Sequence, residues 1–200
     1  MNKKECKLIF KILVIGYSIS GKKELLYLLI NQFFPGNSNN IGADIVKVTI
    51  KINCNDIKLN LISPDGMERF RSLTHSYIQN NDAIIFLFNV TDESSYNRIS
   101  NFYSQTKEYN KAVPTMIIGN FAEDSEHRVV HRAQVKKLAE DNGDLYFELL
   151  NSYDRNIYVY LEILTRRILE TKGIVLRKPN NAYSIILTKT KEQKQQNNCI

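Results

Sequence analysis

The sequence predicts an α/β fold in which five helices flank a mainly parallel, six-stranded sheet. Apolar runs of strand length alternate with segments of helical period, which is the pattern of βαβ units. Residues 83–90 form a nearly continuous apolar run, as expected for a strand covered on both faces. The 200 residues are 43% hydrophobic, which supports one domain with a sizeable core.

The first third of the chain begins with a strand near residues 6–15. Basic residues precede this run as they do in a signal peptide, but a lysine interrupts it and no small-residue cleavage site follows, so a buried strand is favoured. A helix over residues 22–34 and a polar, turn-rich loop come next. Residues 44–53 and 56–62 alternate apolar and polar side chains, which predicts a hairpin near Asn55 as the antiparallel edge of the sheet.

The middle of the chain repeats the order of loop, helix and strand. A loop at Ser63–Gly66 leads to a short helix that ends near Gln79, and the buried strand 83–90 follows. Thr91-Asp92-Glu93-Ser94 places capping oxygens before a helix that ends near Asn110.

The last third completes the sheet and its cover. Residues 114–119 and 145–150 have the length and composition of strands. Residues 133–141 and 156–169 have helical periodicity. The topology that these elements predict needs one antiparallel pair, the hairpin, and is otherwise parallel.

Composition bounds the function. Residues 1–173 are predicted to form one domain, and residues 174–200 a flexible tail rich in Asn, Lys, Gln and Thr. The net charge of +6 is spread along the chain, which argues against nucleic acid; the excess near the ends fits either a solvated tail or a weak attraction to a membrane surface. Three cysteines without metal-ligand spacing fit a reducing cytosol. No run reaches the roughly 20 apolar residues of a membrane span, and a monomer is expected.

The most specific motif is a phosphate-binding loop. Gly16-Tyr17-Ser18-Ile19-Ser20-Gly21-Lys22-Lys23 matches G-x-x-x-x-G-K between a strand and a helix. The glycines allow backbone amides to surround a phosphate, and Lys22 can reach the β and γ phosphates. The usual motif ends in Ser or Thr, whose hydroxyl binds Mg²⁺, whereas Lys23 has no lone pair for a metal. Lys23 either supplies positive charge near the β-phosphate or points to solvent.

From residue 7 to 172 the chain resembles Rab-type small GTPases, which have the Ras-like P-loop NTPase fold. Segments in register with that family are Leu8–Gly16, Ile41-Gly42-Ala43-Asp44, Gly66-Met67-Glu68-Arg69-Phe70, Val90–Tyr96, Val113-Pro114, Gly119-Asn120, Arg128-Val129-Val130 and Phe147-Glu148. The resemblance implies a GTP/GDP switch on the cytosolic face of endomembranes that recruits effectors in vesicle traffic, with exchange and activating factors as further partners. The effector surface that it implies comprises Ile41, Gly42, Asp44 and Phe70.

The positions that serve hydrolysis in this family are altered. The three that hold Mg²⁺ are Lys23, Asn40 and Ser63 here, and only the last two offer neutral oxygens, so metal affinity is expected to be weak or absent. Met67 replaces the Gln that orients the attacking water, and a thioether cannot do so. A pseudo-GTPase is the leading hypothesis, and a slow GTPase that needs accessory factors is the alternative. A P-loop kinase would need a lid with arginines and an acceptor site, which the sequence lacks.

Guanine recognition is altered as well. Asn120-Phe121-Ala122-Glu123 stands for the family's N-K-x-D, with Phe121 as a stacking face and a longer acid. Leu150-Asn151-Ser152 replaces S-A-K, where Asn151 or Ser152 could still present a backbone amide. The expected nucleotide-binding set is Gly16, Ser18, Ile19, Ser20, Gly21, Lys22, Lys23, Gly66, Asn120, Phe121, Glu123, Asn151 and Ser152. In the tail, Cys199 is a candidate for lipidation, but a single cysteine second from the end favours a free thiol.

Overall fold

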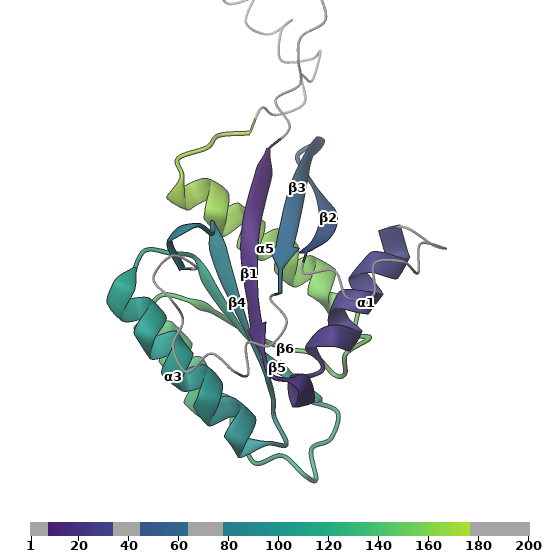
Figure 1. Ribbon diagram of the computed structural model, residues 1–200, viewed down its shortest axis with the longest axis vertical. Coiled ribbons are helices and arrows are strands. Elements are labelled where there is room, and N and C mark those ends of the chain that lie inside the picture. The colour runs from purple at the N-terminus through teal and green to yellow at the C-terminus, as the bar shows by residue number, and fades with distance from the viewer. Residues whose placement is uncertain (1–7, 34–44, 64–77, 177–200) are drawn as a thin grey trace, which may run out of the picture.

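The structure, a computed structural model, describes residues 8–33, 45–63 and 78–176. Six strands form one sheet in the order β2-β3-β1-β4-β5-β6 (Figure 1). The strands are β1 (Ile9–Gly16), β2 (Ile45–Ile52), β3 (Asn55–Ile62), β4 (Ala83–Asn89), β5 (Thr115–Asn120) and β6 (Leu145–Glu148). β2 pairs antiparallel with β3, and the other neighbouring pairs of this sheet are parallel. The predicted fold class, a six-stranded and mainly parallel sheet, is confirmed.

Four α-helices and one short 3-10 helix lie within the described residues. They are η1 (Ser18–Ser20), α1 (Lys22–Phe33), α3 (Glu93–Tyr109), α4 (Arg132–Asp141) and α5 (Asn156–Thr171). The Asp92 side chain accepts a hydrogen bond of 2.9 Å from the amide of Ser94, so the predicted capping group does begin α3. The fifth predicted helix falls mostly in residues 64–77, outside the described ranges, although residues 78 and 79 are helical.

The hairpin turn lies slightly earlier than the sequence indicated. Asn53 and Cys54 form it, with φ of 48° and 62°, and Ile52 pairs directly with Asn55. A two-residue turn with positive φ at both positions matches the right-handed twist of the strands. The Asn55 side chain donates to the carbonyls of Ile52 and Asn53 at 3.3 and 2.8 Å, which stabilises this backbone geometry.

The last strand is shorter than the predicted 145–150. It ends at Glu148, because the following backbone pairs with the loop after β5. The amides of Ala122 and Glu123 donate to the carbonyls of Leu149 and Leu150 at 3.0 and 3.2 Å. These bonds join the two loops that the sequence assigned to base recognition.

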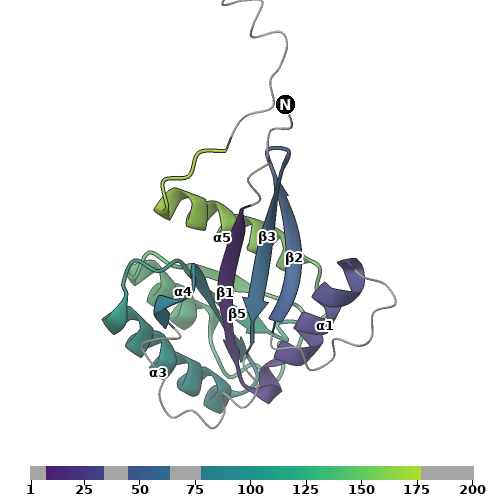
Figure 2. The same cartoon turned by 45° about the horizontal axis from the view of Figure 1, so that its top comes forward.

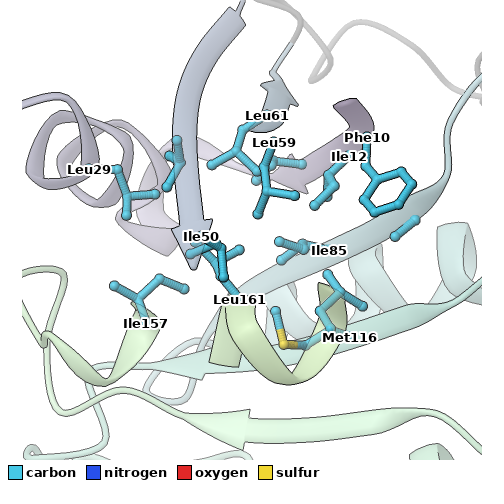
Figure 3. Packing of buried hydrophobic residues seen from close by; sticks show 14 of the residues in the cluster. Phe10, Ile12, Leu29, Ile50, Leu59, Leu61, Ile85, Met116, Ile157 and Leu161 are labelled. Carbon is cyan, nitrogen blue, oxygen red and sulfur yellow. The ribbon is translucent and has the colours of Figure 1, made fainter. Parts of the chain in front are cut away.

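Apolar side chains cover both faces of the sheet. One cluster packs α1 and α5 on the sheet, and in Figure 3 Leu29, Ile157 and Leu161 point toward side chains of the strands. A second cluster packs α3 and α4 on the other face (Figures 1 and 2). All seven residues of β4 are buried, which explains why its sequence is apolar without alternation. Within the described ranges, no helix is both long enough and apolar enough to span a membrane.

A buried ion pair joins α3 to the turn that precedes β6. Lys107 Nζ lies 2.8 Å from the Asp144 carboxylate, and the two side chains are 8% and 6% exposed. The hydroxyl of Tyr103 donates to the same carboxylate at 2.6 Å, and Lys107 also donates to the carbonyl of Val113. Because both charges are removed from water, each depends on its partner for stabilisation.

Glu148, the last residue of β6, is the centre of a second charged network. Its carboxylate accepts two hydrogen bonds of 3.0 Å from Arg128 and further bonds from Arg132 and Tyr146. Burial raises the pKa of the Glu148 carboxyl, but the bonds from Arg132, Arg128 and Tyr146 outweigh this effect and lower the pKa to about 2. This network fixes the end of β6 and the start of α4.

Candidate nucleotide-binding site

The candidate site lies where parallel strands end at one edge of the sheet. β1 ends at Gly16 and leads directly into η1 and α1, as the purple segment of Figure 1 shows. β5 ends at Asn120, and β6 is followed by the loop that contains Asn151 and Ser152. Ligands of parallel α/β sheets bind at this carboxyl edge, so the topology brings the predicted segments to the expected place.

The predicted phosphate loop forms a closed turn. After β1, Tyr17 is extended, Ser18–Ser20 form the 3-10 turn and Gly21 adopts φ 76° before α1 begins. The amide of Ser20 donates to the carbonyl of Tyr17 at 2.9 Å, and the amide of Gly21 donates to the carbonyl of Ser18 at 3.4 Å. The motif predicted that amides of this loop surround a phosphate, but these two amides donate within the loop itself.

Gly16 and Gly21 are required by close approaches. A Cβ at Gly16 would lie 2.7 Å from Ser20 Oγ and 3.0 Å from the carbonyl oxygen of Leu87. A Cβ at Gly21 would lie 2.2 Å from Ser152 Oγ and 2.6 Å from Asn120 Nδ2. Both glycines of the motif therefore allow neighbouring chain segments to touch the loop.

Asn120 joins three segments of the site. Its side chain is fully buried, and Nδ2 donates to the carbonyl of Ser20 and to Ser152 Oγ, both at 2.9 Å. Its Oδ1 accepts a bond of 2.9 Å from the amide of Phe121. The hydroxyl of Ser152 thus contacts the site, whereas the sequence predicted a backbone amide of Ser152 or Asn151 there.

The other residues predicted to contact the base, Phe121, Glu123 and Asn151, contact neighbouring parts of the site. Phe121 has φ 63°, and its ring edge approaches Gly21, with Cζ 3.0 Å from the position of a Cβ there. Asn151 Nδ2 donates to the Glu123 carboxylate at 3.0 Å, while Asn151 Oδ1 accepts from the amide of Tyr153 at 2.9 Å. The carboxylate expected to read the base therefore already accepts a hydrogen bond from the neighbouring loop.

A cavity of about 270 Å³ opens between the phosphate loop and the loops that follow β5 and β6. Its lining comprises Ser18, Ile19, Gly21, Glu24, Phe121, Asn151, Ser152 and Tyr153. Glu24 and Tyr153 were not among the residues predicted from the sequence, although each directly follows a predicted residue. A larger hollow of about 460 Å³ lies between α4, β6 and α5, but none of the predicted nucleotide-binding residues lines it. The smaller cavity is therefore the candidate nucleotide site because of the loops that line it, and not because of its volume.

The two lysines of the motif differ in environment. Lys22, the first residue of α1, is 7% exposed, whereas the side chain of Lys23 is exposed. Ser63, the residue directly after β3, is 6% exposed. Among the residues that the structure describes, no group of three or more His, Cys, Asp or Glu side chains is placed to hold a metal.

Several predicted residues lie outside the described ranges. They are Asn40, Ile41, Gly42, Asp44, Gly66, Met67, Phe70 and Cys199. Their proposed roles in metal binding, hydrolysis, effector recognition and lipidation stay predictions.

Comparison with known proteins defines the family. The Ras family model matches residues 11–170. The chain is 33% identical over 197 residues to "Ras-related protein Rab-13" of Bos taurus, across 96% of this chain and 95% of that protein. It is 32% identical to "Ras-related protein Rab-1" of Theileria parva across 90% and 81% of the two chains, and 28% identical to "Ras-related protein Rab-2B" of Dictyostelium discoideum across 86% and 89%. The similarity thus extends over more than four fifths of each protein, and the chain belongs to the Ras family as a Rab-type small GTPase.

Proposed function

We propose that this chain is a Rab-like module that binds a guanine nucleotide and acts as a switch or adaptor in vesicle trafficking, with weak or absent GTP hydrolysis. The observation that carries the proposal is an asymmetry within the site. The Asn120 network that positions the nucleotide-binding loops is complete, whereas the side chain at the metal-binding position is the ammonium of Lys23.

The retained half of the site supports nucleotide binding. Asn120 is buried and makes three hydrogen bonds, so its geometry is fixed before any ligand arrives. Lys22 lies at the amino terminus of α1, where the helix adds partial positive charge for a phosphate. Phe121 lines the neighbouring cavity with an aromatic side chain that a base can stack against.

The altered half supports slow or absent hydrolysis. An ammonium group has no lone pair for Mg²⁺, and Ser63 offers only a neutral, buried hydroxyl. These two side chains do not form the donor set of a Mg²⁺ site. Met67, outside the described residues, replaces the water-positioning Gln. Because phosphoryl transfer depends on positioning and charge stabilisation, these losses reduce the rate most at the chemical step.

Partner recruitment is the remaining part of the proposal. Effectors bind the surface formed by Ile41, Gly42, Asp44 and Phe70. The protein acts as a monomer, and exchange or activating factors bind it as well. The tail attaches it to the cytosolic face of an endomembrane. Family membership supports these assignments.

The test is a titration of the full chain with fluorescent GDP, first with Mg²⁺ and then with EDTA. We expect binding that EDTA leaves unchanged. Affinity that collapses in EDTA would favour the slow GTPase, and no binding would leave a partner-binding scaffold.

Phosphate release from GTP is measured in parallel. We expect wild type to release no more phosphate than the Lys22→Ala variant. Lys137→Ala is the matched control, because Lys137 is an exposed lysine on α4. Sustained release above the Lys22→Ala level would refute the loss of hydrolysis.

A further inference from the structure

The phosphate end of the site is closed by its own hydrogen bonds. The amides of Ser20 and Gly21 donate to carbonyls three residues earlier, and Ser20 Oγ donates a second bond of 2.6 Å to the carbonyl of Tyr17. Backbone amides bind an anion only when they point toward it. As long as the turn persists, these two amides cannot donate to a phosphate.

Contacts from two other elements hold the turn in place. On one side, the Tyr17 ring stacks on Phe102 at 6.5 Å, and the Arg98 guanidinium lies 4.9 Å from its centre, so α3 anchors the start of the turn. On the other side, Asn120 Nδ2 donates to the carbonyl of Ser20 and anchors its end. The closed geometry is therefore supported by α3 and by the residue that ends β5.

The residues between the two glycines favour this geometry. An anion-binding nest needs residues that alternate between right- and left-handed backbone regions. Ser18, Ile19 and Ser20 do not adopt positive φ, and Ile19 is β-branched, which makes the left-handed region unfavourable for it. The Ile19 side chain is 53% exposed, so burial of this side chain does not explain the turn. Ile19 favours the turn because its backbone avoids positive φ.

The base end, in contrast, is open. The cavity of about 270 Å³ is lined by Phe121 and Ser152 and also by residues of the turn, Ser18, Ile19 and Gly21. Glu24 also lines it and adds a carboxylate, which repels phosphates on this side.

Resting on the proposed guanine-nucleotide function, we propose that the Tyr17–Gly21 turn is a latch that excludes phosphates. The site then recognises its ligand as a nucleoside, through the base end, and admits the phosphates only after the turn opens. The affinity of wild-type protein therefore depends little on the number of phosphates. Ile19 and Ser20 are the residues that set this selectivity.

The test compares guanosine, GMP and GDP by calorimetry on wild type and on Ile19→Gly, which frees the backbone to open. Val129→Gly is the matched control, because Val129 is also β-branched, lies in a loop and is 50% exposed. We expect wild type and Val129→Gly to bind the three compounds with similar affinity. For Ile19→Gly, GDP should bind at least about tenfold more tightly than guanosine, the gain of one added hydrogen bond to a charged group. GDP binding to wild type far more tightly than guanosine would overturn the latch.

Amide hydrogen exchange on the unliganded protein gives a readout independent of ligand. In wild type the amides of Ser20 and Gly21 should be protected, and in Ile19→Gly they should exchange faster while the amides of β4 and β5 keep their protection. Exchange of these two amides at the rate of an unstructured chain in wild type would overturn the latch. Failure of all three compounds to bind either protein would refute the nucleotide function, and the exchange rates would still decide whether the turn is closed.

Discussion

Replacing Asn120 by Ala tests whether one side chain holds the site together. The substitution removes two bonds donated by Nδ2 and the bond that Oδ1 accepts from the amide of Phe121. A hydrogen bond contributes about 1 kcal/mol net, and a buried partner left unsatisfied adds its desolvation cost. Because Asn120 is fully buried, we expect a loss of about 3 kcal/mol in the free energy of unfolding.

The contribution of Ser152 can be separated from the rest. Ser152→Ala removes one of the three bonds and should cost about 1 kcal/mol. In the Ser152→Ala background, Asn120→Ala should then cost about 1 kcal/mol less than in wild type, since their shared bond is already absent. The exposed Asn142, which donates one bond to the carbonyl of Leu138, is the control and should cost less than about 1 kcal/mol when replaced by Ala.

Urea unfolding followed by circular dichroism measures these values. With a slope of about 2 kcal/mol per molar urea, Asn120→Ala should lower the midpoint by about 1.5 M and leave the slope unchanged. A loss below about 1 kcal/mol for Asn120→Ala, or equal losses in the two backgrounds, would show that the bonds seen in the structure do not hold the loops.

Three further substitutions test the networks around the site. Stability should fall as the pH drops from about 4.5 toward 2, because the folded-state pKa of Glu148 is lowered to about 2, and Glu148→Gln should flatten this limb of the pH–stability curve. Asp144→Ala leaves a buried lysine without its counter-ion and should cost about 3 kcal/mol in urea unfolding, against at most about 1 kcal/mol for Lys172→Ala at a partly exposed pair. Gly21→Ala should cost at least about 2 kcal/mol more than Gly143→Ala; both have positive φ, but only the first Cβ meets other atoms within 4 Å. Equal thermal shifts for the two glycine variants would contradict the close packing at the loop.

Local sequence patterns predicted the elements well where one periodicity dominates. The alternation in β2 places every second residue in the core, and the spacing of Ile157, Leu161, Leu164 and Ile168 places one face of α5 there. The loop motif also predicted the position of the site, because glycines and a lysine at that spacing mark the junction of a strand and a helix.

Contacts between distant segments could not be predicted in the same way. The motif specifies its glycines but not the backbone angles of Ser18, Ile19 and Ser20, so the closed turn was missed. The hydroxyl of Ser152 became a partner of Asn120 only through the tertiary fold. Likewise, Lys107 and Asp144 lie 37 residues apart, and neither stands out from its local sequence as a buried charge.

The bond from Asn120 to the carbonyl of Ser20 spans 100 residues of chain, which has a consequence for the order of folding. Closing so long a loop costs chain entropy, so nearer contacts form first. The growing polypeptide makes β1 and its loop long before it makes the side chain that holds that loop. A nucleotide therefore cannot act as a template for early folding, and loss of Asn120 should speed unfolding while the folding rate changes little. We therefore expect the bond between Asn120 and Ser20 to form after the contacts between neighbouring segments of the chain.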